Sequence, residues 1–380
     1  MVSKLSTLNK IYYGSAGTGK TREATIEAVK IIAESEKVDF KLDSYENILQ
    51  NFKTSSNQLS LNIPLNYIVQ IQKQNDLEKI LDNIPRKHKI TIEDIKNYKE
   101  NYNKYPLVET VTFHPSYTYQ DFVEGISVET TEKNQIIYKP KDGIFKKLCD
   151  RAIANKDYNY VLLIDEINRG DISSIFGELF TLLEDDKRKG KDEELSINLP
   201  YSKDDKGNPK KLSVPSNLFI VASMNTVDKS IALIDVALRR RFDFIEMKPD
   251  HTLLKDIKID DINLVEMLKV INDRITILKN EHYQIGHSYF LKIESFNDLK
   301  RVMTKNIIPL LQEYFYDDWQ SICAVLNQSY TQSNNEDGLF DIKKADDKMF
   351  SNEFKDLIEF NNKRIVTIRD FKVADIKTIY

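Results

Sequence analysis

The stretch IYYGSAGTGKTREAT, residues 11–25, decides the fold, because an apolar run leads directly into a glycine-rich loop that ends in Lys-Thr. Residues 14–21 read GSAGTGKT and satisfy the pattern G-x-x-x-x-G-K-[ST] of phosphate-binding loops. The residues before the loop predict a buried strand over 10–13, and the apolar period after it predicts a helix over 21–32. A phosphate-binding loop requires this strand and this helix, so a chance glycine-rich loop is disfavoured.

Each residue type in the loop has a chemical reason to be there. Glycines allow backbone amides to curl around phosphate groups. Lys20 neutralises the β and γ oxygens of a nucleotide, and the Thr21 hydroxyl is a ligand for Mg²⁺. We therefore predict GTP or ATP as the substrate and Mg²⁺ as the cofactor. The predicted nucleotide-binding residues of the loop are Gly14, Ser15, Ala16, Gly17, Thr18, Gly19, Lys20 and Thr21.

Composition sets the class of protein. With 380 residues and 41% hydrophobic content, the chain can bury a substantial core and has the length of two or three domains. A net charge of -4 argues against an autonomous DNA-binding protein, so any contact with nucleic acid is expected to be local. The sequence shows neither a long apolar run nor a signal-peptide core, which predicts a cytoplasmic protein without membrane contact. Cys149 and Cys323 lack metal-ligand spacing and are predicted core residues.

The order of patterns along the chain predicts the domains. Three strand candidates, VETVTFHPSY, NYVLLIDEIN and NLFIVASMNT, alternate with helical segments, which is typical of an α/β domain with a parallel sheet. A polar stretch at about 34–105 is interpreted as a helical or partly flexible insertion in this domain. We place the α/β domain at 1–248, a smaller α-helical domain at 249–327, and a polar, then strand-like extension at 328–380.

Two adjacent acids end the second strand candidate, in LLIDE. The carboxyl ends of parallel strands lie beside the phosphate loop, so Asp165 is predicted to hold the Mg²⁺ shell and Glu166 to polarise the attacking water. Adjacent carboxylates at the end of an apolar strand are costly without a cation nearby, which favours this role over an ordinary surface turn. Asn225, in MNT at the end of the next strand, is predicted to orient the same water, although such an Asn taken alone is more often a turn residue.

Three arginines end a short predicted helix in ALRRRF, residues 237–242. For any single one of them, the alternative is a solvated basic helix terminus that suits the helix dipole. Phosphoryl transfer, however, builds negative charge on the γ-phosphate, which an arginine from a neighbouring subunit can stabilise. We predict that at least one of the three does so.

Together these motifs resemble the McrB family of AAA+ NTPases, the GTP-dependent motor subunits of modification-dependent restriction systems. Glycine-rich Lys-Thr loops occur in many NTPases, whereas the FHPSY, IDEINR and MNT blocks together are much more diagnostic. The matching stretches stand in family order: FHPSYTYQDFVEG (113–125), VLLIDEINRGDISSIFGELFTLLEDDKR (161–188), MNTVDKSIALIDVALRRRF (224–242), YQIGHSYF (283–290) and IIPLLQEYFYDDW (307–319).

The resemblance implies an AAA+ P-loop core, with helices flanking a parallel sheet, and a smaller helical lid. It further implies a homo-oligomeric ring, expected to be a hexamer, that holds each nucleotide between subunits. Lys20 and Thr21 then bind phosphate and Mg²⁺, and Asp165 and Glu166 form the acidic pair, with Glu166 catalytic.

Four positions near the third strand follow from the same resemblance. Asn225 and Asp228 fall in the family's signature beside the nucleotide, and Arg240 falls where the family has its trans-acting finger, with Arg241 next to it. Lys229 departs from the family, which has Arg there. Since Lys makes no bidentate contact, a contact made by that position is expected to be weaker or absent here.

In function, the resemblance implies an NTPase that couples hydrolysis to movement on DNA and activates a McrC-type nuclease partner in defence against foreign DNA. No nuclease motif is evident in the chain, so cleavage is assigned to the partner. Long family members carry an N-terminal domain that reads modified cytosine; here DNA recognition is expected in another chain, in the insertion or in a domain outside this sequence. No motif decides between guanine and adenine, so the GTP preference rests on the resemblance alone.

Two alternatives remain open. A MoxR-like protein-remodelling ATPase has a similar core, and stimulation by a protein client would favour it over a restriction motor. A nucleotide-gated oligomeric scaffold would bind without productive turnover, but intact Lys20, Asp165, Glu166 and Asn225 argue against it.

Two further motifs have structural interpretations. The aromatic residues of FHPSYTYQDFVEG are predicted to pack a loop onto the sheet, with a nucleic-acid channel as the alternative. His287 is interpreted as a hydrogen-bonded lid residue near the nucleotide, because five histidines without clustered spacing predict no metal site. A charged region at 185–211 is predicted to be hairpin-like.

Overall fold

The computed structural model describes residues 8–35, 107–130, 133–227, 236–331, 338–344 and 364–380. They belong to two compact units, which we describe separately. The first unit consists of Met1–Tyr13, Lys20–Met224 and Asp228–Glu246, and the second of Gly14–Gly19, Asn225–Val227 and Met247–Tyr380. From residue 36 on, the predicted insertion lies outside the described residues.

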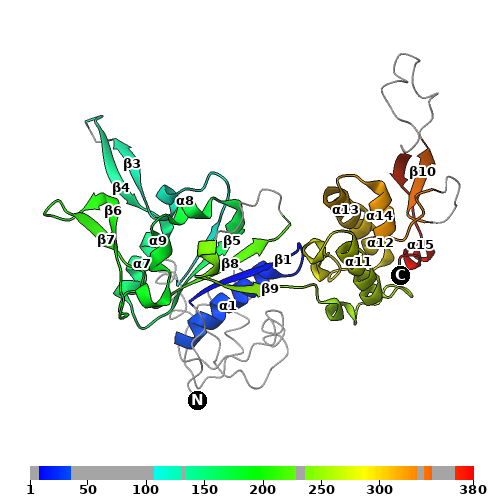
Figure 1. The fold of residues 1–380 in the computed structure, drawn as a ribbon, viewed down its shortest axis with the longest axis horizontal. Helices are drawn as coiled ribbons and strands as arrows, with labels where there is room; N and C mark the ends of the chain where they lie inside the picture. The colour runs from blue at the N-terminus through cyan, green and yellow to red at the C-terminus, as the bar shows by residue number, and fades with distance from the viewer. Residues whose placement is uncertain (1–7, 36–106, 131–132, 228–235, 332–337, 345–363) are drawn as a thin grey trace, which may run out of the picture. The chain divides into compact units, whose positions relative to one another are not determined.

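A five-stranded sheet forms the centre of the first unit, in the order β2, β5, β8, β1, β9 (Figure 1). The pairs β2–β5, β5–β8 and β1–β9 are parallel, which confirms the predicted α/β fold. β5 and β8 are buried along nearly their whole length, as expected of strands covered on both faces. The strands are β1 (Asn9–Gly14), β2 (Val108–Thr112), β5 (Tyr160–Asp165), β8 (Leu218–Asn225) and β9 (Asp243–Glu246).

Helices flank this sheet, and α1 and α7 both pack against β5. α1 begins at Lys20, directly after the glycine-rich loop, and buries Ala24, Ala28 and Ile31. The helices of this unit are α1 (Lys20–Ser35), α6 (Tyr119–Phe122), α7 (Ile144–Ala154), α8 (Ile172–Phe176), α9 (Leu179–Leu182) and α10 (Val236–Arg239), with 3-10 turns at Ile167–Arg169 and Asp185–Lys187.

The aromatic motif after β2 packs inside the first unit. Phe113 and Phe122 are fully buried. The Phe122 ring lies 5.0 Å from the Phe145 ring and 4.9 Å from the Phe176 ring, measured between centroids, and Tyr117 stacks on Phe113 at 5.1 Å. The predicted packing role is therefore confirmed for these residues, and α6 begins with a capping box in which Thr118 and Asp121 satisfy each other's backbone amides.

Two antiparallel strand pairs extend from the first unit. β6 (Ile197–Lys203) and β7 (Pro209–Leu212) confirm the predicted hairpin. β3 (Glu124–Thr130) and β4 (Ile136–Asp142) form a second pair, which the sequence analysis does not predict. The buried carboxylate of Glu124 accepts hydrogen bonds from the backbone N–H groups of Tyr201 and Ser202, at 2.8 and 3.2 Å, and so joins the two pairs.

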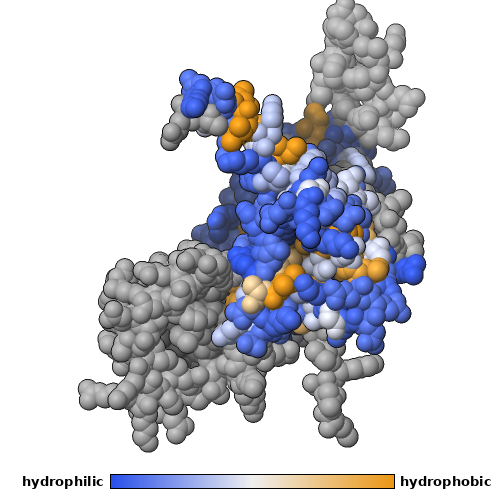
Figure 2. Space-filling model, turned by 90° about the vertical axis from the view of Figure 1, so that its left-hand side faces the viewer, coloured by the Kyte–Doolittle hydropathy of each residue, from blue (hydrophilic) through white to orange (hydrophobic). Residues whose placement is uncertain are grey.

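The β3–β4 pair has one apolar and one polar face. The register sets Val128 opposite Tyr138, and these side chains are 63% and 71% exposed. On the other face Lys139 and Glu129 form an ion pair at 2.6 Å. Figure 2 shows hydrophobic residues gathered on a projecting part of a surface that is otherwise mostly hydrophilic.

The second unit is a helical domain with a small two-stranded sheet. One hydrophobic cluster joins its helices to the C-terminal residues, including Leu339, Phe340, Phe371 and Ile376, so residues that the sequence analysis sets apart at 328–380 share a core with the helices. Its elements are a 3-10 turn at His251–Leu254, α11 (Leu264–Leu278), 3-10 turns at Glu281–Tyr283 and His287–Tyr289, α12 (Phe296–Val302), a π-helical turn at Met303–Ile307, α13 (Ile308–Phe315), α14 (Trp319–Val325), β10 (Phe340–Lys344), β11 (Arg364–Ile368) and α15 (Val373–Lys377).

Both cysteines are core residues, as predicted. Cys149 lies in α7 of the first unit and Cys323 in α14 of the second, and each is almost completely buried. Burial raises the pKa of the Cys323 thiol to about 12 and that of Cys149 above its usual range. In the part of the chain that the structure describes, no helix is both long enough and apolar enough to cross a membrane.

Candidate nucleotide-binding site

Thr21 and Asp165 meet at the carboxyl edge of the sheet. Thr21 lies in the first turn of α1, and its hydroxyl Oγ1 donates to Asp165 Oδ1 at 3.0 Å. Asp165 ends β5, which runs parallel to its neighbours, so its carboxylate reaches the edge where α1 begins. A hydroxyl and a carboxylate oxygen this close are the ligand types that Mg²⁺ takes alongside water and phosphate, so the residues present fit the predicted metal.

A third side chain completes this arrangement. Ser223, on β8, donates its hydroxyl hydrogen to Asp165 Oδ1, and its Oγ accepts a hydrogen bond from the backbone N–H of Glu166 at 3.2 Å. Ser223 is 3% exposed, so this hydroxyl is satisfied inside the protein. The sequence analysis does not name Ser223. The sequence feature that could have identified Ser223 is its place two residues before Asn225, on the strand beside β5.

Glu166 occupies an unusual backbone conformation. Its φ and ψ angles are 52° and 49°, in the left-handed region, which is uncommon for a residue with a side chain. Such a conformation costs on the order of 1–3 kcal/mol and tends to occur at functional sites. Here it turns the chain sharply from β5 into the 3-10 turn at Ile167–Arg169, and the Glu166 carboxylate lies 3.5 Å from the Arg169 guanidinium.

A cavity of about 270 Å³ lies on the first unit beside Thr21 and Asp165. Thr21, Thr25, Thr112 and Asp165 contribute to its lining, together with apolar residues, so the lining comes from α1, β2 and β5.

The glycine-rich loop itself belongs to the second unit, where lid residues bind it. Backbone N–H groups of Gly286 and Ser288 donate to the carbonyl oxygens of Ala16 and Gly17, both at 3.0 Å. Gly17 has a φ of +78°, and a Cβ built on Gly286 would lie 1.9 Å from the backbone of Gly17. The YQIGHSYF motif is thus a segment that packs its glycine directly on the loop.

Further contacts hold the loop and the lid segment in shape. The Thr18 hydroxyl donates to Ser15 O at 3.0 Å, and the backbone N–H of Thr226 donates to Gly14 O at 3.1 Å, so the residue after Asn225 lies against the loop. His287 is nearly buried, and its Nδ1 accepts a hydrogen bond from the backbone N–H of Asp250 at 3.0 Å. The predicted hydrogen-bonding role of His287 is confirmed. Among the described residues no cluster of His, Cys, Asp and Glu has metal-binding geometry.

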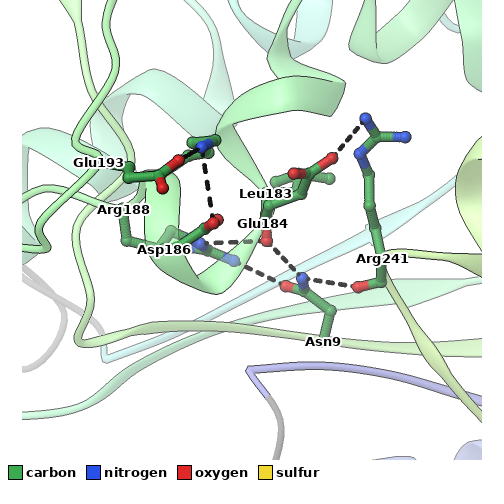
Figure 3. Close-up of polar contacts among 8 residues, drawn as sticks. Asn9, Leu183, Glu184, Asp186, Arg188, Glu193 and Arg241 are labelled. Carbon is green, nitrogen blue, oxygen red and sulfur yellow. Dashed lines mark hydrogen bonds and ion pairs between the residues drawn. The ribbon is translucent and has the colours of Figure 1, made fainter.

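The three arginines differ in their surroundings. Arg241 is held within its own chain, because its guanidinium forms an ion pair with Glu184 at 2.7 Å (Figure 3). The guanidinium also lies over the Phe180 ring. Its side chain is only 13% exposed. Arg240, by contrast, is exposed at the end of α10. Asp228 and Lys229 lie outside the described residues.

A buried polar network contacts the backbone of Arg241 (Figure 3). Asn9, the first residue of β1, donates through Nδ2 to both Arg241 O and Leu183 O at 2.9 Å. Arg188 donates to Asn9 Oδ1 at 2.8 Å and is fully buried. The sequence analysis assigns no role to Asn9 or to Arg188, although Arg188 is the last residue of the matching stretch 161–188.

Comparison with known proteins agrees with this geometry. Residues 95–242 match the family model of the AAA domain, dynein-related subfamily, and residues 263–323 match the model of the McrB α-helical lid domain. The chain is a McrB-like AAA+ protein. The lid match runs from α11 into α14, and the AAA match spans β2, β5, β8 and the arginines. The glycine-rich loop precedes the matched residues.

Two curated relatives of this McrB-like chain belong to restriction enzymes. The type IV methyl-directed restriction enzyme EcoKMcrB subunit of Escherichia coli (strain K12) is 37% identical over 230 residues, which are 56% of this chain and 48% of that protein. The type II restriction enzyme BsuMI component YdiS of Bacillus subtilis (strain 168) is 30% identical over 170 residues, 38% of this chain and 50% of that protein. The chain spans about half the length of these relatives.

Proposed function

We propose that this chain is a Mg²⁺-dependent nucleoside triphosphate hydrolase that acts as a subunit of a restriction system. The observation that carries the proposal is the convergence of Thr21, Asp165 and Ser223 at the carboxyl edge of the sheet, next to Glu166 in its strained conformation. The AAA match and the two restriction relatives support the same assignment.

The roles proposed for the side chains are supported by the contacts of Thr21 and Asp165, by phosphoryl-transfer chemistry and by the resemblance to the family. Thr21 and Asp165 would hold Mg²⁺, which supplies positive charge to the phosphate oxygens. Lys20 neutralises the same oxygens, and the loop amides over 14–19 cradle them. Glu166 accepts a hydrogen bond from the attacking water and orients it toward the γ-phosphorus. Asn225, and Asp228 beyond it, assist at the same water.

Arg240 is the proposed contribution of a neighbouring subunit. It is exposed, whereas Arg241 is engaged by Glu184, so Arg240 is the better candidate to reach another chain. An arginine supplied in trans stabilises charge on the γ-phosphate and typically accelerates hydrolysis by about 10³- to 10⁵-fold. The proposal therefore includes a homo-oligomeric ring, of six subunits by resemblance to the family.

The finer assignment follows the family. We propose that GTP is the preferred nucleotide, that hydrolysis drives movement on DNA, and that a McrC-type nuclease subunit is the partner that cuts. Support comes from the relatives' membership of restriction enzymes and from the lid match.

The test is steady-state hydrolysis of GTP and ATP side by side with Mg²⁺, with and without DNA and the nuclease subunit. We expect GTP turnover that rises with the partner and is lost in Lys20→Ala. Turnover no higher than that of Lys20→Ala under every condition would exclude a hydrolase. ATP turnover that responds to a protein client but not to DNA or nuclease would instead indicate a remodelling ATPase.

A further inference from the structure

Arg188 is a buried cation whose hydrogen-bond acceptors are all uncharged. It is 0% exposed, and its guanidinium donates to Leu218 O at 3.1 Å, to Pro215 O and Leu183 O at 3.4 Å, and to Asn9 Oδ1 at 2.8 Å. Burial lowers its pKa to about 10, so it stays protonated at neutral pH. Burying a guanidinium costs several kcal/mol unless its donors are satisfied. These four oxygens, and Asn9 Oδ1 above all, therefore have to stay in place to satisfy the donors of Arg188.

Asn9 uses both ends of its amide. The oxygen accepts from Arg188, which fixes the orientation of the amide, and the nitrogen is thereby aimed at Arg241 O and Leu183 O, at 2.9 Å each. Asn9 is 3% exposed, so water does not replace these bonds. Figure 3 shows the chain of contacts running from Arg188 through Asn9 to the backbone of Arg241.

Arg241 is consequently held at two points, its carbonyl by Asn9 and its guanidinium by Glu184. Arg240 precedes it in the chain and is exposed. Fixing the backbone and side chain of one residue restricts where its neighbour can point, while leaving the neighbour's own side chain open to another molecule.

We infer that Asn9, oriented by Arg188, is a positioning residue for the arginine that this chain supplies to a neighbouring subunit. The inference rests on the proposed role of Arg240 in trans. An arginine that stabilises developing charge must be held to within a fraction of an ångström, and a displacement of about 1 Å can cost about 100-fold in rate.

The test uses Asn9→Asp in the full chain. Aspartate keeps the volume and the acceptor for Arg188, and adds a countercharge, but it cannot donate to Arg241 O or Leu183 O. We expect kcat to fall about 10- to 100-fold while nucleotide affinity stays close to wild type, with a lower unfolding midpoint because two buried carbonyl oxygens lose their donor. Glu184→Gln is the matched variant, because it weakens only the hold on the Arg241 side chain, and a smaller loss is expected.

A subunit-mixing experiment separates positioning from a general loss of structure. The Lys20→Ala variant has a defective phosphate loop but intact arginines, and it is mixed with Asn9→Asp, whose phosphate loop is intact. Where the two are neighbours in a ring, the loop of Asn9→Asp receives a well-placed arginine from the Lys20→Ala subunit. We expect activity above that of either variant alone. Unchanged kcat in Asn9→Asp, or a loss that mixing does not restore, would overturn the inference. If Asn9→Asp fails to fold, Glu184→Gln takes the same mixing test with the same criteria.

Arg240→Ala separates this inference from the proposed function. If Arg240→Ala is inactive alone and restored by mixing, while Asn9→Asp and Glu184→Gln hydrolyse like wild type, only the positioning inference fails. If Arg240→Ala hydrolyses like wild type, the arginine in trans fails, and the positioning inference fails with it.

Discussion

Ser223 shows how a single hydroxyl can organise two acids. It donates to Asp165 and accepts from the backbone N–H of Glu166, so it fixes the carboxylate that would face Mg²⁺ and the turn that carries the proposed base. The contact is between neighbouring strands β5 and β8, and neither strand alone could make it.

We expect Ser223→Ala to weaken Mg²⁺-dependent nucleotide binding, because Asp165 loses a donor that orients it. The expected rise is about 5- to 30-fold in the Mg²⁺ concentration for half-maximal binding, equivalent to about 1–2 kcal/mol for a buried hydrogen bond. The measurement is titration with a fluorescent nucleotide, with and without Mg²⁺. Ser223→Thr retains the hydroxyl and serves as the control, and an equal loss in both variants would contradict the assignment.

Glu166→Gln should separate binding from hydrolysis. Glutamine preserves the side chain's size but is a poor proton acceptor, so we expect kcat to fall by about 10²- to 10⁴-fold with nucleotide affinity retained. Single-turnover hydrolysis and equilibrium binding measure the two quantities. Wild-type turnover in Glu166→Gln together with inactivity of Lys20→Ala would favour a nucleotide-gated scaffold.

For single residues, the sequence predicts those that belong to motifs and misses those that hold the motif residues in place. Thr21 and Asp165 are predictable because the phosphate chemistry fixes their types and their distance from a strand end, and the structure brings them to 3.0 Å. Ser223, Asn9 and Arg188 act only through contacts between distant segments, for example across 179 positions from Asn9 to Arg188, which no local pattern records. The roles given to Asn225, Asp228, Arg240 and Arg241 remain predictions.

Among the elements, the lid segment 284–290 is defined by its contact with the glycine-rich loop. We expect Gly286→Ala to impair nucleotide binding, since a Cβ there would lie 1.9 Å from the backbone of Gly17 and neither backbone can yield cheaply. Overpacking of this kind costs about 1–3 kcal/mol, or about 5- to 150-fold in affinity if the loop is displaced.

The matched control is Gly207→Asn, in the β6–β7 turn. Gly207 also has a positive φ, of +81°, but a Cβ there meets nothing within 4 Å, and Asn tolerates the left-handed region. Nucleotide titration and thermal unfolding of both variants make the comparison. Equal nucleotide affinity in Gly286→Ala and wild type would contradict the prediction, because it would show that the segment 284–290 can move to accommodate the added carbon.

The 3-10 turn at His251–Leu254 gives the lid unit a pH dependence. Asn272 accepts from Ile285 N and donates to Ile285 O, so its Nδ2 faces His251 Nε2, at 3.2 Å, and that ring nitrogen must be an acceptor. Burial lowers the His251 pKa below its usual 6.5. The unfolded chain therefore takes up the proton first, and the stability contributed by neutral His251 is present above pH 6.5 and lost as pH falls through the lower folded pKa.

Trp319 is the single tryptophan and lies in the same unit, so its fluorescence can follow unfolding by denaturant. We expect the free energy of unfolding to decrease below pH 6.5 in wild type. His251→Gln, which keeps an acceptor but does not titrate, should show a smaller decrease. Parallel pH profiles in the two proteins would exclude His251 as the cause.

Element prediction succeeds where the pattern has one dominant cause. β5 and β8 are predictable from their continuous apolar runs, because both faces of each strand are covered by the protein. β3 and β4 are not predicted because their apolar face is exposed and the alternation stands among charged residues. β9 is not predicted because it has only four residues and lies close after the arginines, with Phe242 between. The lid helices are predictable from their period, whereas the contact of the C-terminal residues with them is not.

For the whole molecule, the two buried cysteines provide one reporter in each unit. Both thiols are expected to react slowly with a maleimide in the native protein, because each is buried and burial raises its pKa. On addition of increasing urea, peptide mass spectrometry should reveal whether Cys149 and Cys323 become reactive together or in turn. Rapid labelling of either one without urea would contradict its place in the core.

The contact of Gly286 with Gly17 has an evolutionary consequence. A Cβ built on Gly286 would lie only 1.9 Å from the backbone of Gly17, whereas a Cβ on Gly17 would meet the side chains of Tyr289 and Ser288. A side chain at position 286 therefore requires one of the two backbones to move, which a change of neighbouring side chains cannot provide. Among homologues, position 286 should remain glycine wherever this segment packs on the loop, and another residue there would mark lineages in which the contact has changed.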